Sequence, residues 1–285
     1  MFWNEVDCTL PLIMTFSIWF VILHYTFCLS DGTSTIFDGS VNDESSVTSA
    51  GHNSDSCARV PHLTTHAFQK SFKGRSPVIF SSSSYQNSTF KARVTRDSLL
   101  FSFADAPIVL ASSNSNSYDK RNSRFVDYVL STVDVPIAPN TSALDIWYMF
   151  GDTPMMGDSR WANLMSSYEM PMDANEDDGL PTFGIGGLNS GVAFHTHGAA
   201  FGETIIGKKK WFLSPPTRRP IFNSSISQLD WSLLMQDKNQ DVITCIVGEG
   251  EVIYIPPNWW HATLNLANWN SFVSTFTREK MSLLT

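Results

Sequence analysis

The sequence is poor in charged residues, and basic residues are the scarcer kind. Of 285 residues, 16% are charged, with 19 Lys and Arg against 27 Asp and Glu and a formal net charge of −8. A nucleic-acid-binding protein needs a basic surface to neutralise phosphates, so this balance argues against nucleic acid as a partner. Hydrophobic residues make up 42% of the chain. A packed core is therefore expected, and global disorder is excluded.

The first basic residue is Arg59, and residues 11–29 contain no Asp, Glu, Lys or Arg at all. This apolar stretch has the length of a secretory signal or of a membrane anchor. Cleavage after Ser30 would put Cys28 and Ser30 at the two positions that require small residues. A buried core helix is the alternative, but the Ser-rich sequence that follows offers nothing to pack against. We expect residues 1–30 to be a signal peptide or signal anchor.

Cysteine is also scarce, with four in the whole chain. Cys8 and Cys28 fall in the expected signal, which leaves Cys57 and Cys245 in the mature protein. An oxidising compartment permits a disulfide between them, and two buried free thiols are the alternative. Glycosylation sequons occur at three positions, about as many as the composition produces by chance, and are predicted glycan sites: Asn87, Asn140 and Asn223.

The patterning predicts a single domain with a mixed α/β first half and a β-rich second half. Residues 31–56 read as a flexible linker, 57–277 as the domain and 278–285 as a tail. In the first half we expect helices at 64–73, 89–100, 124–130 and 159–168, and strands at 77–81, 107–111 and 144–150. In the second half we expect one helix, 226–236, and strands at 182–186, 192–196, 201–206, 210–214, 242–247, 251–255, 260–266 and 271–277. Many short strands at even spacing predict a jelly roll.

Three histidines in the β-rich half form the strongest chemical signal. His195 and His197 are two residues apart, and on a strand such residues point to the same face. His261 follows in a later segment, so a neighbouring strand could supply a third imidazole to one metal ion. Imidazole suits Fe(II), Zn, Ni and Cu, and the three ligands alone do not identify the metal.

The segment around His261 matches the second motif of the cupin superfamily. The matching positions are Gly250, Pro256, Asn258, His261 and Asn265. Asn258 stands where the motif has glycine, and Asn is the residue that best replaces glycine where φ is positive. Trp259 and Trp260 in the same segment are expected to pack in the core.

Longer segments resemble the JmjC, or cupin-like, 2-oxoglutarate oxygenase family. They are GVAFHTHGAAFGETIIGKKKWFLSPP at 191–216 and GEVIYIPPNWWHATLN at 250–265, supported by LDIWYMFGD at 144–152, FGIGGLNSGVAFH at 183–195 and FVSTF at 272–276. The likeness covers about residues 57–277 and includes the contexts of both domain cysteines. It is closest to a small group of the endoplasmic reticulum lumen. The resemblance implies a double-stranded β-helix with Fe(II) and 2-oxoglutarate as cofactors.

The resemblance also implies roles for individual residues. His195 and His261 match the family's two metal-binding histidines, whereas His197 stands where the family has a carboxylate. Lys209 matches the lysine that pairs with the distal carboxylate of 2-oxoglutarate, and Tyr148 is a weaker candidate for the same carboxylate. A solvated basic run at 208–210 is the alternative for Lys209. Phe276 lies near the place where many relatives have asparagine.

Three functions remain open from the sequence. The first is a 2-oxoglutarate-dependent oxygenase of the secretory pathway, most simply a protein hydroxylase with a luminal protein as its substrate. The second is an inactive scaffold or assembly protein with the same fold and a luminal protein partner, which His197 and Phe276 favour. The third is a plain cupin in which Glu203 is a fourth metal ligand beside the three histidines. Contact with a membrane is expected only through an uncleaved N-terminal segment.

Overall fold

The computed structural model describes residues 56–81, 87–115, 117, 119–151, 157–174, 178–239 and 241–277. The predicted signal or anchor, nearly all of the predicted linker and the predicted tail lie outside the described residues. Within the described residues, no helix is long and apolar enough to cross a membrane.

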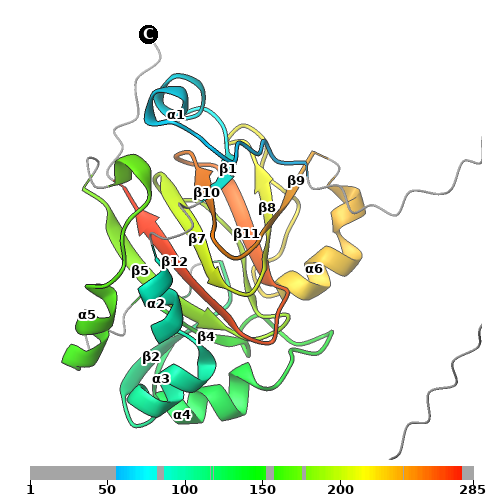
Figure 1. Cartoon of the computed structure of the whole chain (residues 1–285). Helices are drawn as coiled ribbons and strands as arrows, with labels where there is room; N and C mark the ends of the chain where they lie inside the picture. The colour runs from blue at the N-terminus through cyan, green and yellow to red at the C-terminus, as the bar shows by residue number, and fades with distance from the viewer. Residues whose placement is uncertain are drawn as a thin grey trace, which may run out of the picture. The chain divides into compact units, whose positions relative to one another are not determined.

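Two antiparallel sheets form the centre of the domain (Figure 1). The larger sheet has the order β1-β10-β7-β12-β5-β4-β2-β3, and the smaller has the order β6-β11-β8-β9. Their strands are β1 Val78–Ser81, β2 Pro107–Ser112, β3 Lys120–Arg124, β4 Trp147–Phe150, β5 Leu180–Gly186, β6 Gly191–His195, β7 Ala200–Ile206, β8 Lys209–Ser214, β9 Ile243–Val247, β10 Glu251–Ile255, β11 Trp260–Asn265 and β12 Asn270–Phe276. From β5 onward the chain passes repeatedly between the sheets. This is the predicted jelly roll, a double-stranded β-helix.

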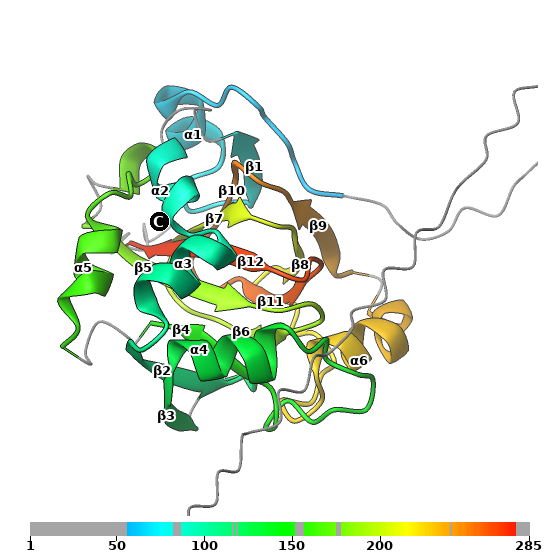
Figure 2. The ribbon, with the colours of Figure 1, turned by 60° about the horizontal axis from the view of Figure 1, so that its bottom comes forward.

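Helices cover the outer faces of both sheets (Figures 1 and 2). The helices are α1 Thr65–Ser71, α2 Ser88–Arg93, α3 Arg96–Phe103, α4 Phe125–Tyr128, α5 Ser159–Met165 and α6 Gln228–Leu234. Helices α2 to α5 share a core with β5, β7 and β12 of the larger sheet, and Trp161 lies in it beside Phe103 and Phe183. Helix α6 packs through Trp231 on the smaller sheet. The inner faces of the two sheets, which the helices do not cover, line the interior of the jelly roll.

The predicted helix 89–100 is two helices in the structure. The backbone of Thr95 is extended, with φ −64° and ψ 153°, and this breaks the helical path between α2 and α3. The Thr95 hydroxyl accepts a hydrogen bond from the Ser98 backbone N–H, so it caps the start of α3. A favourable N-cap inside an otherwise helical pattern therefore ended one helix and began another.

Strand β3 was not predicted, and the helix expected at 124–130 was only partly correct. The side chains of Lys120–Arg124 are largely exposed and polar, so they carry no alternating pattern. The strand exists because its backbone pairs with β2 along the full edge of the larger sheet. After α4 the chain continues as a π-helix, Val129–Val133, rather than ending at residue 130.

The disulfide between Cys57 and Cys245 is present, with the two Cα atoms 5.5 Å apart. It joins the segment before α1 to β9, and the two run side by side (Figure 2). Arg59 reinforces the same attachment by donating to the Ile246 carbonyl at 2.9 Å and pairing with Glu251. The start of the domain is thereby bound to the edge of the jelly roll at its β9–β10 end.

Candidate metal centre

Three imidazoles converge at one end of the jelly roll. Strands β6 and β11 pair antiparallel, and their register places His195 directly opposite His261. His197 lies just beyond the end of β6. The ring centroids of His195 and His197 are 4.2 and 4.4 Å from that of His261. One nitrogen from each ring lies within 4.8 Å of the others, so the predicted set of histidines can hold one metal ion.

Backbone carbonyls fix the orientation of all three rings. The Nδ1 atoms lie 2.9 Å from Ala193 O for His195, 2.7 Å from Gly198 O for His197 and 2.9 Å from Trp259 O for His261. A carbonyl oxygen only accepts, so we assign the ring proton to Nδ1 in each case. The Nε2 lone pairs are then directed into the common space, which is the tautomer that metal binding needs.

The spacing and charge of the rings also suit a metal. The Nε2 atoms of His197 and His261 are 2.9 Å apart. Two nitrogens at right angles around an ion at a typical bond length would be about 3.0 Å apart. Burial lowers the pKa of His195 to about 4, and it also lowers the pKa values of His197 and His261. All three rings are therefore neutral ligands at physiological pH.

Asn258 positions His197, which has no strand to hold it. The backbone of Asn258 has φ of 63°, in the left-handed region that the motif comparison predicted for this position. Its N–H donates to the His197 carbonyl at 2.8 Å. The turn before β11 is thus tied to the turn after β6, and the two metal-binding segments are held together.

Glu203 does not join the three histidines. It lies on β7 with its carboxylate on the face covered by helices, whereas the neighbouring Gly202 faces Trp211 in the interior. The carboxylate accepts hydrogen bonds from Tyr168 Oη at 2.7 Å and from Asn87 Nδ2 at 3.1 Å. The hypothesis of Glu203 as a fourth metal ligand does not fit this geometry, because the carboxylate is buried on the other side of the sheet.

The predicted glycan at Asn87 does not fit the folded domain either. Asn87 is buried, and Nδ2, the atom that would carry a glycan, donates to Glu203 and to the Glu169 carbonyl. Asn140 and Asn223 are exposed and stay predicted sites.

A cavity of about 240 Å³ extends from the histidines to Lys209. Lys209 is 6% exposed, so the sequence alternative of a solvated basic run is wrong for this residue. Its Nζ lies 3.1 Å above the Phe272 ring. No acidic side chain among the described residues pairs with it. Desolvation lowers the pKa of Lys209 to about 7.

The cavity contains a further donor that the sequence reasoning missed. Trp211 lines it, and the buried indole N–H has no hydrogen-bond partner among the described residues. Lys209 and Trp211 are two apart on β8 and so share a face, which was a usable signal in the sequence. Tyr148, the weaker candidate, also lines the cavity, with its hydroxyl 2.8 Å from Ser117 Oγ. An unpaired ammonium and an unpaired N–H suit a carboxylate ligand.

Aromatic side chains close the cavity beside the metal centre. The Phe276 ring centroid is 4.9 Å from that of His197, and Phe276 lines the cavity. Trp259 is half-buried and packs against the core cluster that contains Leu213 and Cys245. Trp260 is also half-buried; it packs against the core cluster that contains Phe194 and Phe212, and it borders the outer side of the histidines.

Comparisons with known proteins agree with this architecture. The chain is 36% identical over 222 residues to JmjC domain-containing protein 8 of Mus musculus, covering 76% of this chain and 80% of that protein. The Homo sapiens protein of that name is 36% identical over 218 residues. Arginine-specific demethylase JMJ22 of Arabidopsis thaliana is 27% identical over 184 residues, which is 52% of this chain and 37% of that protein.

The two-sheet jelly roll and its histidine cluster, which can hold a metal ion, together with these relatives define a JmjC-type protein. Within that class, the chain belongs to the family of JmjC domain-containing protein 8.

Two other similarities are weak or cover a short segment. The Escherichia coli ribosomal oxygenase YcfD matches with a TM-score of 0.44 and 14% identity over 78% of this chain, which spans about half of that structure's length. A glucose-6-phosphate isomerase family model matches residues 230–282. That segment runs through α6 and β9 to β12, and its four strands belong to the two sheets of the jelly roll.

Proposed function

We propose that the chain binds Fe(II) and 2-oxoglutarate and acts as an oxygenase on a protein of the endoplasmic reticulum lumen, most simply as a hydroxylase. One observation carries this proposal. A single cavity has three converging Nε2 atoms at one end and the unpaired Lys209 ammonium at the other. A 2-oxoglutarate molecule needs this combination, because one end chelates the metal and the other is a free carboxylate. The luminal location rests on the apolar N-terminal stretch and the disulfide.

The residues of the chain have separate tasks in this proposal. His195, His197 and His261 would hold the metal and leave three positions open, while Lys209 and Trp211 would hold the distal carboxylate. When bound, Fe(II) and 2-oxoglutarate supply reduction of dioxygen coupled to oxidation of 2-oxoglutarate to succinate and carbon dioxide, with one oxygen atom delivered to a C–H bond.

A specific observation favours a second candidate, an inactive scaffold or assembly protein. His197 is a neutral ligand where the wider family has a carboxylate, so the metal centre carries one more positive charge than in relatives. The Phe276 ring packs on His197 where many relatives have a polar residue. Both features leave metal binding possible and make turnover harder.

Calorimetric titration of the full chain under anaerobic conditions separates these candidates. Mn(II) or Fe(II) is added with and without 2-oxoglutarate to the wild type and to His197→Asp. Metal binding followed by 2-oxoglutarate binding in the wild type supports the oxygenase. Metal binding without 2-oxoglutarate binding, even in His197→Asp, supports the scaffold.

Lys209→Ala should weaken 2-oxoglutarate binding by about 10- to 100-fold and leave metal binding intact, because it removes a charge-assisted hydrogen bond to the distal carboxylate. The matched control is Lys208→Ala, since Lys208 is exposed on the same basic run. Calorimetry with the metal-loaded chain measures both constants. Equal losses of 2-oxoglutarate affinity in Lys208→Ala and Lys209→Ala would contradict the assignment of Lys209.

The affinity for 2-oxoglutarate should fall as the pH rises above about 7. The pKa of Lys209 is lowered to about 7, so the amine is increasingly neutral above that pH and must take up a proton to bind a carboxylate. We expect about a tenfold loss of affinity per pH unit. Calorimetry in buffers of different ionisation enthalpy should show nearly one proton taken up at pH 8. An affinity for 2-oxoglutarate that stays constant from pH 6.5 to 8.5 would contradict binding through the Lys209 ammonium.

A further inference from the structure

A second depression reaches the histidines from the outside of the domain. It has a volume of about 860 Å³, much more than the inner cavity. His195 and His197 line both spaces, so the metal centre lies between them. The other described residues that line this depression, called the outer groove below, are Ser115, Phe194, Thr196, Arg219, Phe222, Asn223, Ser224 and Trp260.

Arg219 provides the charge of the outer groove. Its guanidinium carbon lies 5.4 Å from the centre of the Phe222 ring and 5.3 Å from that of Trp260. No ion pair joins Arg219 to an acidic residue among the described residues, and no Asp or Glu is among those that line the groove. In a chain with a net charge of −8, this local absence of acid leaves the guanidinium available to an anion.

The segment that carries Arg219 is held firmly in place. Ser214 Oγ donates to the Arg218 carbonyl at 2.7 Å, which closes the turn before Arg219. After it, the Ile221 N–H donates to Asn239 Oδ1 at 2.7 Å, and the Trp231 indole N–H donates to the Ile221 carbonyl at 2.9 Å. Because the backbone on both sides of Arg219 is held and two aromatic rings flank its guanidinium, ordering this side chain against a carboxylate costs less conformational entropy.

We propose that the outer groove binds a polypeptide substrate through an acidic side chain, with Arg219 as the residue that determines this specificity. The inference rests on the proposed function, since it names the substrate class of the same metal centre. The planar guanidinium matches a carboxylate in a two-point hydrogen bond. A groove of about 860 Å³ that is lined mainly by polar side chains suits an extended peptide, whereas the inner cavity of about 240 Å³ suits a small cosubstrate. The peptide would reach the metal from the side opposite Lys209.

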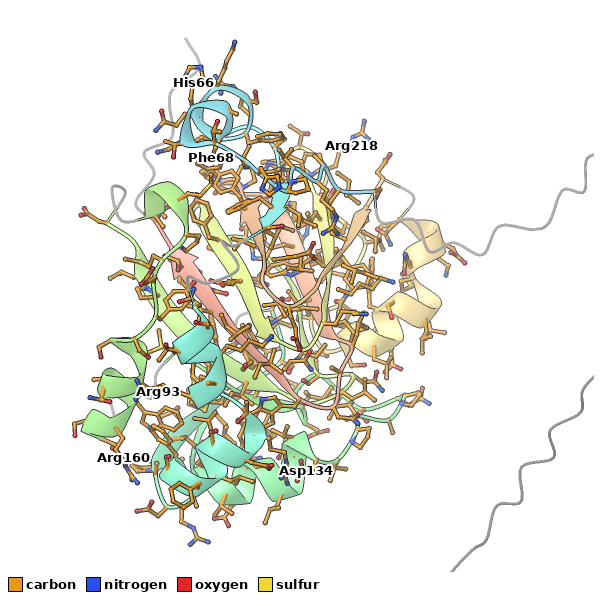
Figure 3. The ribbon with its side chains drawn as sticks, in the orientation of Figure 1. His66, Phe68, Arg93, Asp134, Arg160 and Arg218 are labelled. Carbon is orange, nitrogen blue, oxygen red and sulfur yellow. A yellow bond between two sulfur atoms is a disulfide. The ribbon has the colours of Figure 1, made fainter. Side chains whose placement is uncertain are left out.

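The test uses three fluorescein-labelled peptide pools of nine residues, with Asp, Asn or Lys at the centre and mixed Gly, Ser, Ala and Leu elsewhere. Anisotropy measures their affinity for the full chain loaded with Zn(II). Every protein carries Ser225→Ala, which removes the sequon at Asn223 and alters no residue of the groove. The variants are Arg219→Ala and Arg219→Lys, with Arg218→Ala as the matched control. Arg218 points away from the fold (Figure 3) and pairs with Asp241 at 2.8 Å.

The Asp pool should bind at least about fivefold more tightly than the Asn pool, and the Lys pool should bind most weakly. Arg219→Ala should remove this preference, Arg219→Lys should keep part of it, and Arg218→Ala should leave it unchanged. Equal binding of the Asp and Asn pools by the wild type would overturn the proposal. An equal loss of the preference for Asp in Arg218→Ala and Arg219→Ala would overturn it as well.

Calorimetry with Mn(II) and 2-oxoglutarate on the same proteins separates this inference from the proposed function. An Arg219-dependent preference for Asp without 2-oxoglutarate binding keeps the outer groove as a peptide site and rejects the oxygenase. Binding of 2-oxoglutarate without a preference for Asp keeps the oxygenase and rejects the role of Arg219.

Discussion

His261→Ala should weaken binding of Mn(II) or Fe(II) by at least about 100-fold. His261 is the most buried of the three histidines, and its Nε2 lies 2.9 Å from that of His197, so the remaining two rings lose the ligand that both of them face. Isothermal calorimetry of the full chain gives the affinities directly. His66→Ala is the matched control, because His66 is exposed on α1, projects from the fold (Figure 3) and is not part of the metal centre.

Thermal unfolding checks the same result by an independent route. A metal at 100 times its dissociation constant stabilises the native state by about 2.7 kcal/mol. This gain should be present in the wild type and in His66→Ala and absent in His261→Ala. A variant without the His261 imidazole that binds metal as tightly as the wild type would show that the metal lies elsewhere.

Asn87→Asp should destabilise the domain by about 3–5 kcal/mol, because it places a second carboxylate against the buried carboxylate of Glu203. Asn87 Nδ2 donates to both oxygens of Glu203, at 3.3 and 3.1 Å, and to the Glu169 carbonyl at 3.0 Å. Asp has no donor to replace these hydrogen bonds. Urea unfolding followed by tryptophan fluorescence gives the free energy of unfolding.

Asn223→Asp is the control for this prediction, since Asn223 is an exposed residue in the same kind of sequon. We expect it to change the free energy of unfolding by less than about 0.5 kcal/mol. Mass spectrometry of the chain expressed through the secretory pathway adds a second measurement, in which Asn87 should carry no glycan. Equal stability of the two variants, or a glycan at Asn87 of the folded protein, would contradict the buried hydrogen bonds.

The positions of the three histidines could be predicted because their signals are local. The two-residue spacing of His195 and His197 and the motif around His261 both survive in the structure. Even so, His197 lies beyond the end of β6. It is held in place by the hydrogen bond from the Asn258 N–H to its carbonyl and not by strand pairing. Lys209 is the buried residue of its basic run, whereas Lys208 is exposed and Lys210 half-buried, and its role toward 2-oxoglutarate stays a prediction.

The face of the sheet on which the Glu203 side chain lies could not be predicted in the same way. Glu203 is eight residues after His195, and on one continuous strand both would face the same side. The turn between β6 and β7 resets the alternation, so Glu203 faces the helices instead. Strand β3 was hidden for a related reason, because its pairing with β2 is a property of the sheet edge and not of its own polar side chains.

The sequence by itself determined the strand-rich second half, the histidine cluster, the positive φ of Asn258 and the cysteine pair open to oxidation, because each depends on residue type and short spacing. Only the tertiary structure decided three other features. Asn87 donates to Glu203, an unpaired indole N–H shares the cavity of Lys209, and Arg219 lines the same groove as His195 without an ion pair. Asn87 and Glu203 are 116 residues apart. Contacts at such separations are decided by how sheets and helices pack, and no local pattern in the chain records them.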